Sequence, residues 1–200
     1  MPRHKTVERE QILSDTRRRL LEAAAEEFAR CGYSQANINH ISEAAGFARG
    51  TVYNYFTSKA QLMSDLITQI AEEHCELIAG QVLQERDPRR RLERFYQAGF
   101  EFVAGHPAQA RLMATTWNGP LAEFKEQIVR ACLPLFRLLS QDILDKGIEI
   151  ELFHPVDREA TVLLLMTLYL GSIAQADPAG KIWLDHRQVS YFALSALCQV

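Results

Sequence analysis

The sequence predicts an all-α fold, and three observations support this prediction. Apolar residues recur at three-to-four spacing along almost every periodic stretch. No run of alternating apolar and polar residues is long enough to form a sheet. Glycine and proline stand between the periodic stretches, where they end one helix and open the next. We therefore expect about nine helices, and an apolar content of 48% is enough for a sizeable core.

The first third of the chain predicts one helix followed by shorter ones. The first helix runs from about residue 9 to Cys31 and ends at Gly32, the usual residue type after a helix C-terminus. Asn37 caps a second helix, which ends at Gly46. Apolar stripes on the two helices would pack together, formed by Leu20, Leu21, Ala24, Ala25, Phe28, Ile38, Ile41 and Ala45.

The remaining helices are predicted from caps and breaks. Ser58 and Gln61 have the spacing of a capping box for a long helix from about Lys59 to Leu83. Asp87 followed by Pro88 is a favourable cap and first-turn pair for the next helix, and Pro134 should bend a later one. The other expected helices end near Ala104, Trp117 and Lys146 or cover about 157–176 and 185–199, with a connector over 147–156.

Composition argues against several classes of protein. No apolar window approaches about 18 residues, so no membrane span is expected, and the N-terminal residues do not resemble a secretory signal. We expect a cytoplasmic protein without a membrane partner. The four cysteines form no CxxC pair, which indicates reduced thiols rather than a zinc or redox motif. Residues 1–60 carry a net charge of +2 and residues 61–200 carry −5, so a polyanion would be tolerated mainly by the first third.

The helix capped by Asn37 and the segment after it form a candidate helix-turn-helix. Two helices joined by a glycine-containing turn lie across one another, and in DNA-binding proteins the second enters the major groove. Here the second helix is expected from about Arg49 to Tyr55. Val52 and Phe56 are four residues apart and would hold it against the core. The other side chains of this segment would face outward, where they could contact DNA.

The residue types on this outer face suit DNA contact. Arg49 would bind guanine, Thr51 would contact a thymine methyl group and Asn54 would pair with adenine. The hydroxyls of Tyr53 and Tyr55 would donate to phosphates, which fixes position without reading sequence.

Further contacts are expected around this segment. Gly50 lets the backbone approach the duplex, and Lys59 at a helix start would meet a phosphate. The complete predicted DNA-binding set is Asn37, Asn39, His40, Arg49, Gly50, Thr51, Tyr53, Asn54, Tyr55 and Lys59.

The motifs F-x-x-x-G-Y, I-x-x-I-x-x-x-A-G and G-T-V-Y-x-Y-F-x-S-K resemble the N-terminal domain of TetR-type transcriptional regulators. The close resemblance covers about residues 13–65. Three positions depart from the family pattern: Asn37 replaces the usual threonine, Ser42 the usual alanine, and Ala48 a frequent Ser or Thr cap. The matching residues are Phe28, Gly32, Tyr33, Ile38, Ile41, Ala45, Gly46, Gly50, Thr51, Val52, Tyr53, Tyr55, Phe56, Ser58 and Lys59.

The resemblance implies two domains and a regulatory function. Residues 1–58 would form the DNA-binding domain, with the motif at about 37–56, and residues 59–200 would bind a ligand and form a homodimer. Such a dimer would bind double-stranded DNA at a palindromic operator, act as a repressor, and be released by a small-molecule effector. The resemblance implies no cofactor and no metal.

The last two helices are the expected dimer interface. The stretch from Val162 to Ala174 is apolar nearly all round, which predicts burial on more than one side. Val189, Phe192, Ala193, Ala196 and Leu197 form a stripe on the last helix. The alternative is that both helices belong to the core of a monomer.

A ligand pocket is expected among the middle helices. Aromatic side chains with polar tips and flexible methionines suit a mostly hydrophobic ligand, although each of them, taken singly, is more typical of core packing. The candidates are Tyr96, Phe100, Phe102, Met113, Trp117, Phe124, Met166 and Tyr169.

Other signals are weaker. Glu151 and His154 have the Glu-x-x-His spacing of metal bundles, but such sites need two copies on helices, and here one copy lies in a connector. Arg89-Arg90-Arg91 is more typical of a solvated helix face than of a nucleic-acid site. Arg3, His4 and Lys5 form either a DNA-contacting arm or a frayed terminus.

Two alternative functions remain open. We find no nucleophile–base motif and no phosphate-binding glycine loop, which argues against an enzyme. A helical ligand-binding or scaffold module without DNA function is one alternative, and a helical enzyme is the weaker one.

Overall fold

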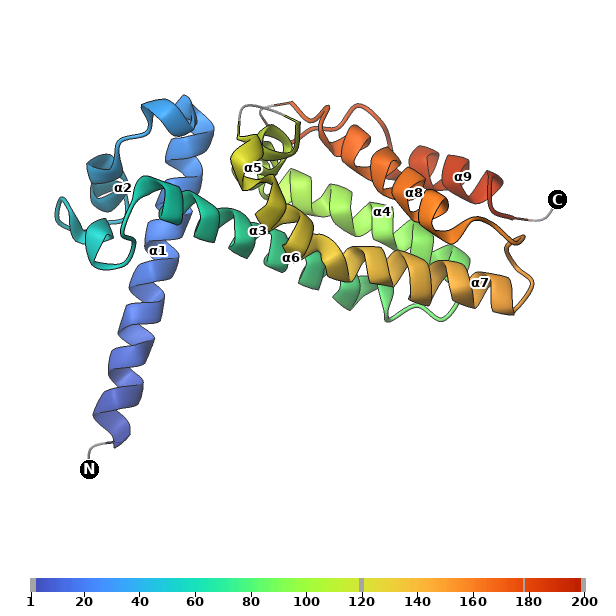
Figure 1. Ribbon diagram of the computed structural model, residues 1–200, viewed down its shortest axis with the longest axis horizontal. Coiled ribbons are helices and arrows are strands. Elements are labelled where there is room, and N and C mark those ends of the chain that lie inside the picture. The colour runs from blue at the N-terminus through green and yellow to red at the C-terminus, as the bar shows by residue number, and fades with distance from the viewer. Residues whose placement is uncertain (1–2, 119–120, 178, 199–200) are drawn as a thin grey trace. The chain divides into compact units, whose positions relative to one another are not determined.

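The computed structural model describes residues 3–118, 121–177 and 179–198 (Figure 1). The chain forms two compact units, Met1–Ile67 and Thr68–Val200, and the division falls inside α3 (Lys59–Val82). Every regular element of the described residues is helical, with one isolated bridge between Phe153 and Cys198, which confirms the all-α prediction. None of these helices combines the length and apolarity needed to cross a membrane.

The first unit contains α1 (Arg3–Gln35), α2 (Ile38–Ala44), the 3₁₀ turn η1 (Thr51–Asn54) and the start of α3. Gly32, at φ +78°, interrupts α1 at the position predicted for its end. The predicted stripe of α1 is buried, and Phe28 is only 2% exposed. The side chains of Arg3, His4 and Lys5, predicted as a possible arm, lie outside the described residues.

The predicted helix from Arg49 to Tyr55 was wrong in extent, because only the 3₁₀ turn Thr51–Asn54 forms. Gly50 adopts φ +78°, a left-handed conformation that cannot continue into a right-handed helix. Ala48 offers no side-chain oxygen to cap a longer helix, and no side-chain cap bond is made at Gly50. The segment is therefore held by its neighbours rather than by its own helical bonds.

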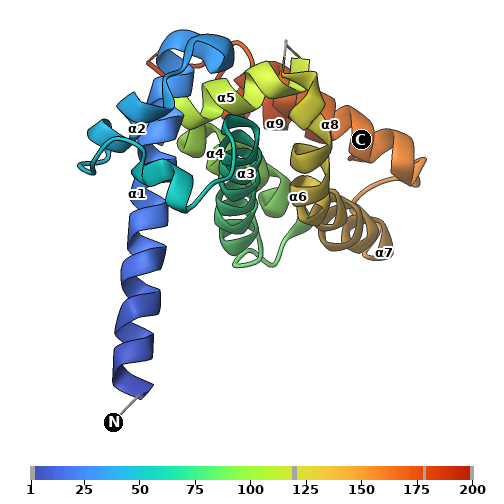
Figure 2. The same cartoon turned by 60° about the vertical axis from the view of Figure 1, so that its left-hand side comes forward.

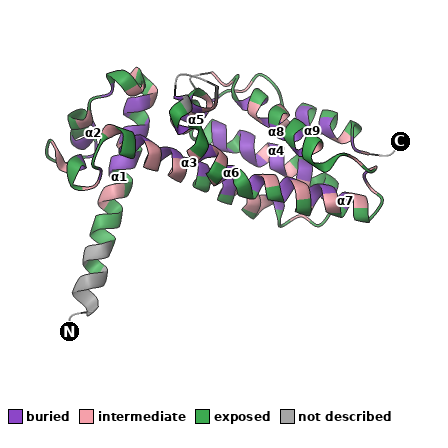
Figure 3. Ribbon diagram, viewed as in Figure 1, coloured by how far each residue is buried: buried purple, intermediate pink, exposed green. Residues whose placement is uncertain are grey.

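The second unit is a bundle centred on α4 (Pro88–Gly105), seen from two directions in Figures 1 and 2. Most of the inward face of α4 is buried (Figure 3), and its N-cap is Asp87, as predicted. α4 packs against several other elements of the unit. The remaining helices are α5 (Pro107–Asn118), η2 (Ala122–Phe124), α6 (Lys125–Arg137), η3 (Leu138–Asp145), α7 (Lys146–Glu149), α8 (Arg158–Ile173) and α9 (His186–Ser195).

The long helix predicted to reach Lys146 is a run of different helical types. α6 contains Pro134 and is followed by the π-helix η3 and then by α7, which extends the run to Glu149. Proline cannot donate to the carbonyl four residues earlier, and it crowds the preceding turn. The change of hydrogen-bonding pattern at Leu138, four residues after Pro134, fits such a disturbance. The predicted turn at Gly119 and Pro120 lies outside the described residues.

A group of aromatic and polar side chains forms the centre of the second unit. The Tyr169 hydroxyl lies 2.5 Å from Nε2 of His74, and the Tyr96 hydroxyl donates to the carbonyl of Leu165 at 3.1 Å. Burial raises the pKa of both phenols, so they remain neutral. Gly99 lies against the Tyr169 ring, and a Cβ at Gly99 would be 2.2 Å from Cε2 of that ring.

We predict that Gly99→Ala destabilises the second unit by about 1–3 kcal/mol, the usual cost of overpacking. Tyr169 is fully buried, and its hydroxyl is held against Nε2 of His74. Gly80→Ala is a matched control, because a Cβ at this helical position meets nothing within 4 Å. The control should raise stability by up to about 1 kcal/mol. Thermal unfolding of both variants tests this, and equal midpoints would contradict it.

We predict that burial of His74 makes the second unit less stable in acid. Burial lowers the pKa of His74 from 6.5 to about 4, so the unfolded chain binds one more proton between these values. Stability is therefore fully present above about pH 6.5 and falls by about 3 kcal/mol as the pH drops to 4. Urea titrations of the native protein and of His74→Gln should show a smaller loss in the variant over this range.

Candidate nucleic-acid interface

The α2–η1 pair is assembled around a buried hydroxyl. Ser42 is fully buried, and its Oγ accepts a hydrogen bond from the backbone N–H of Val52 at 3.1 Å. This bond joins α2 directly to η1. Val52 and Phe56, exposed by 1% and 2%, anchor the turn as predicted. The replacement of the family's usual alanine by Ser42 thus adds a polar link to the apolar contacts.

A second polar link holds the C-terminal end of α2. Nη2 of Arg19, on α1, donates to the carbonyl of Ala45 at 2.7 Å, and its guanidinium lies over the Phe47 ring. Gly46 is at φ +79°, and a Cβ there would come within 2.8 Å of the same Nη2. Glycine at this position therefore allows the positive φ of the turn and leaves room for the Arg19 side chain.

The outer face of η1 is available for contact, as predicted. Tyr53 is 56% exposed, Asn54 is exposed, and Thr51 and Tyr55 are half-buried. Arg49 is exposed, with its Nε paired to Glu43 Oε1 at 2.5 Å. Reading of bases or phosphates by these residues stays a prediction.

Lys59 is bound within the protein. Its Nζ donates to the carbonyls of Ser34 and Ala36 at 3.0 and 3.1 Å and lies 5.1 Å from the centre of the Tyr33 ring. These contacts fasten the α1–α2 connection to the start of α3. The predicted phosphate contact of Lys59 is untested, but sequence reasoning missed this structural role.

The start of α2 carries the other predicted residues. Asn37 caps the helix, since its Oδ1 accepts from the N–H of Asn39 at 2.9 Å. Asn39 and His40 are exposed. The Nδ1 of His40 lies 2.9 Å from Oε2 of Glu27, a buried residue of α1 that sequence reasoning did not single out. Glu27 directly follows Glu26 in the sequence, so no local pattern marks it as buried.

The predicted ligand-pocket residues are mostly core. All of them are buried except Trp117, which is half-buried. His74 brings two of them together, because its ring lies against Phe102 and Tyr169, and Tyr96 is a further neighbour of Tyr169. Nδ1 of His74 is buried without a hydrogen-bond partner. Binding of a ligand by this group remains a prediction.

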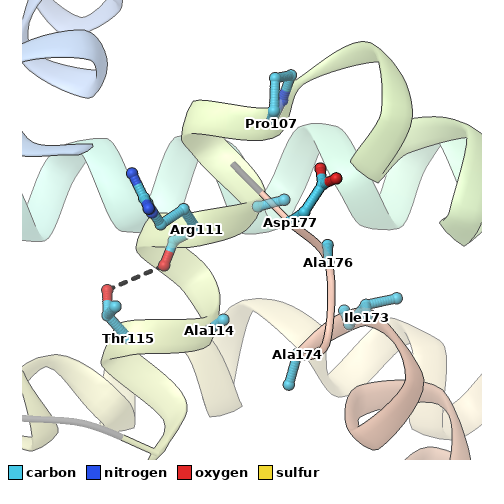
Figure 4. Close-up of a pocket in the computed structure, with 9 residues that line it drawn as sticks. Pro107, Arg111, Ala114, Thr115, Ile173, Ala174, Ala176 and Asp177 are labelled. Atoms are coloured by element: carbon cyan, nitrogen blue, oxygen red, sulfur yellow. Dashed lines mark hydrogen bonds between the residues drawn. The ribbon is translucent and has the colours of Figure 1, made fainter. Parts of the chain in front are cut away.

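The grooves of the second unit lie elsewhere. One of about 370 Å³ is formed by α5 and the end of α8, with mostly small apolar residues and the charged residues Arg111 and Asp177 in its lining (Figure 4). Another of about 580 Å³ lies between α4 and residues 180–187, and Phe100 is the predicted pocket residue that lines it. No group of three metal-binding side chains is found within the described part of the chain.

Comparison with known proteins gives the same assignment as the motif. Residues 20–66 match the family of bacterial regulatory proteins known as the tetR family. The chain is 30% identical over 120 residues to a probable acrEF/envCD operon repressor of Escherichia coli K12. That alignment covers 57% of this chain and 51% of the relative, so it spans about half of the relative's length. This chain is also 25% identical over 183 residues to the repressor KstR2 of Mycobacterium tuberculosis, and that alignment covers 91% of this chain and 92% of KstR2.

Solved structures share the whole fold. FadR of Bacillus halodurans superposes with a TM-score of 0.76 at 22% identity, covering 89% of this chain and 94% of that one. FadR of Bacillus subtilis, solved with stearoyl-CoA, gives 0.75 at 20% identity, with coverage of 88% and 95%. The relatives described here are named as regulators, and none is named as an enzyme. Residues 20–66 thus match the N-terminal domain of the tetR family of bacterial regulatory proteins, and the chain shares the helical fold of these solved structures.

Proposed function

We propose that this protein is a transcriptional repressor that binds a palindromic operator as a homodimer and is released by a small hydrophobic effector. The observation that carries the proposal is the α2–η1 pair, which combines a family match with an exposed outer face. Paired reading elements about 34 Å apart would meet successive major grooves on one side of the duplex. The protein would act in the cytoplasm, where bacterial DNA lies.

The proposed dimer interface is the outer face of α8 and α9. Leu163, Leu164, Tyr191 and Phe192 are each at least 59% exposed. Exposed apolar side chains on neighbouring helices typically mark an interaction site. A second copy of the same face would bury them in a bundle of four helices.

The proposed effector site is the interior around His74. Its aromatic neighbours favour an apolar ligand, and Nδ1 of His74 offers one polar contact. FadR of Bacillus subtilis, solved with stearoyl-CoA, supports an effector that contains a long apolar chain. Effector binding would shift the population of dimers away from the one that fits the operator, within the limit of its differential affinity.

We predict separate effects from two residues of η1. Asn54→Ala should relax sequence preference and cost about 1–3 kcal/mol on the preferred duplex, as expected for loss of a base contact. Tyr53→Phe should weaken binding to all duplexes about equally and leave its salt dependence unchanged, because it removes an uncharged contact with a phosphate. Gel-shift titrations with selected and random duplexes measure both effects.

The control for Tyr53→Phe is Thr115→Val, which removes an exposed hydroxyl from α5 in the second unit. It should bind DNA like the native protein. Equal binding by all three variants would contradict the assignment of the reading face. Failure of the native protein to prefer any duplex would instead favour the scaffold alternative.

We predict that Leu164→Arg produces monomers. Leu164 is 65% exposed on α8, and two arginines facing each other across a dyad would be buried without partners. Leu83→Arg, at a residue 52% exposed after α3, is the control and should remain dimeric. Sedimentation velocity distinguishes the two, and a dimeric Leu164→Arg protein would exclude this face as the interface.

A further inference from the structure

Glu27 is an unexpected residue at its position. It lies on the inner face of α1 and is only 6% exposed, next to the buried Phe28. Burying a carboxylate costs free energy unless hydrogen bonds replace its water. The contacts of Glu27 therefore indicate what its charge does in the first unit.

The carboxylate joins α1 to the start of α2. Oε1 accepts from the backbone N–H of Asn37 at 3.3 Å and lies 3.6 Å from Sγ of Cys31. Oε2 accepts from Nη2 of Arg30 at 2.6 Å and lies 2.9 Å from Nδ1 of His40. Two of these partners belong to α1, while Asn37 and His40 belong to α2. One buried group thus fixes both the backbone and a side chain at the start of α2.

The contact with Glu27 determines which nitrogen of the His40 ring carries a hydrogen. Burial would raise the pKa of the Glu27 carboxyl, but hydrogen bonds from Arg30, His40 and Asn37 outweigh it and lower the pKa to about 2. The ionised carboxylate only accepts hydrogen bonds, so Nδ1 of His40 carries a hydrogen and donates it. Nε2 is then the atom left for an external partner, and it has none within the described residues. The His40 side chain is 54% exposed.

We propose that Glu27 is a positioning residue for DNA binding, which holds His40 so that Nε2 of its ring donates to a DNA phosphate. This inference rests on the proposed function. α2 is the first helix of the pair, and in helix-turn-helix proteins that helix crosses the DNA backbone. A phosphate is therefore the partner within reach.

The proposed contact requires a hydrogen on each ring nitrogen of His40. Phosphate oxygens only accept, so Nε2 donates to the phosphate while Nδ1 donates to Glu27. The cationic ring then lies between two anions, the Glu27 carboxylate and the phosphate. Arg30 of α1 shares Oε2 of Glu27 with the ring, and Glu43, one turn further along α2, is paired with Arg49.

The experiment uses the full chain and a 30-base-pair duplex, about three helical turns, that the native protein enriches from a random library. Its dissociation constant is measured at several salt concentrations for Glu27→Gln, His40→Gln and the double variant. Glu22→Gln is the matched control, since it removes the same charge from an exposed site on α1, where Glu22 pairs with Arg18. Thermal unfolding checks that each variant is folded.

We expect Glu27→Gln and His40→Gln each to weaken binding about tenfold and to lower the salt slope by about one phosphate contact. The double variant should bind no more weakly than either single variant, because both changes remove the same contact. Glu22→Gln should bind as well as the native protein or better, because it removes a charge that repels DNA. If Glu27 acted only as a negative charge that repels DNA, Glu27→Gln would also bind more tightly. If Glu27 positions His40, Glu27→Gln binds more weakly, so the direction of the change in affinity distinguishes the two explanations.

Each contrary result has a distinct meaning. His40 is exposed, so His40→Gln should fold normally, and native affinity and salt slope in this variant would overturn the inference even if Glu27→Gln unfolds. Multiplying effects in the double variant would also overturn it, because Glu27 would then act apart from His40. If the native protein enriches no sequence, the proposed function fails and this inference fails with it.

Discussion

The first unit depends on one constraint, the shortness of its reading elements. α2 has seven residues and η1 has four, and isolated helices of this length are not stable in water. Their positions must therefore come from contacts with longer elements. Apolar contacts fix part of the position of α2 and η1, since Ile41 is fully buried and Val52 and Phe56 are nearly buried. Apolar contacts are non-directional, however, and do not by themselves set the angle of a short turn.

Directional bonds supply the missing orientation. Arg19 binds the C-terminal end of α2, Glu27 binds its N-terminal end, and Ser42 links it to η1. Each bond joins residues that are at least ten positions apart in the chain. The exposed face of η1 is thus oriented from behind by three polar contacts, and its own side chains remain free for a partner.

The sequence predicted this unit well where the signal was local. Asn37 caps α2, Asp87 caps α4, and Gly32 and Gly46 adopt positive φ at the predicted helix ends. Ser58 caps α3 as expected, but the Gln61 side chain binds the N–H of Thr57. Such features depend on residues within one turn of each other, which periodicity and capping rules describe.

Long-range contacts could not be predicted in the same way. Lys59 and Glu27 look like ordinary charged helix residues in sequence, and only the fold brings them to the carbonyl of Ser34 and to His40. The stripe predicted on the last helix also divides in the structure. Val189 and Ala193 are buried, whereas Phe192 is 63% exposed. Spacing groups residues on one side of a helix, but it does not show how wide the covered sector is.

The two buried polar residues, Glu27 in the first unit and His74 in the second, differ in charge. In the first unit Glu27 stays charged, because several donors surround it and outweigh the cost of burial. In the second unit His74 stays neutral, because burial against the Phe102 and Tyr169 rings disfavours the charged form and lowers its pKa. A charged group with all its bonds made suits a fixed scaffold for DNA contact. In the second unit the neutral ring leaves Nδ1 without a hydrogen-bond partner, which is the feature on which the proposed effector site rests.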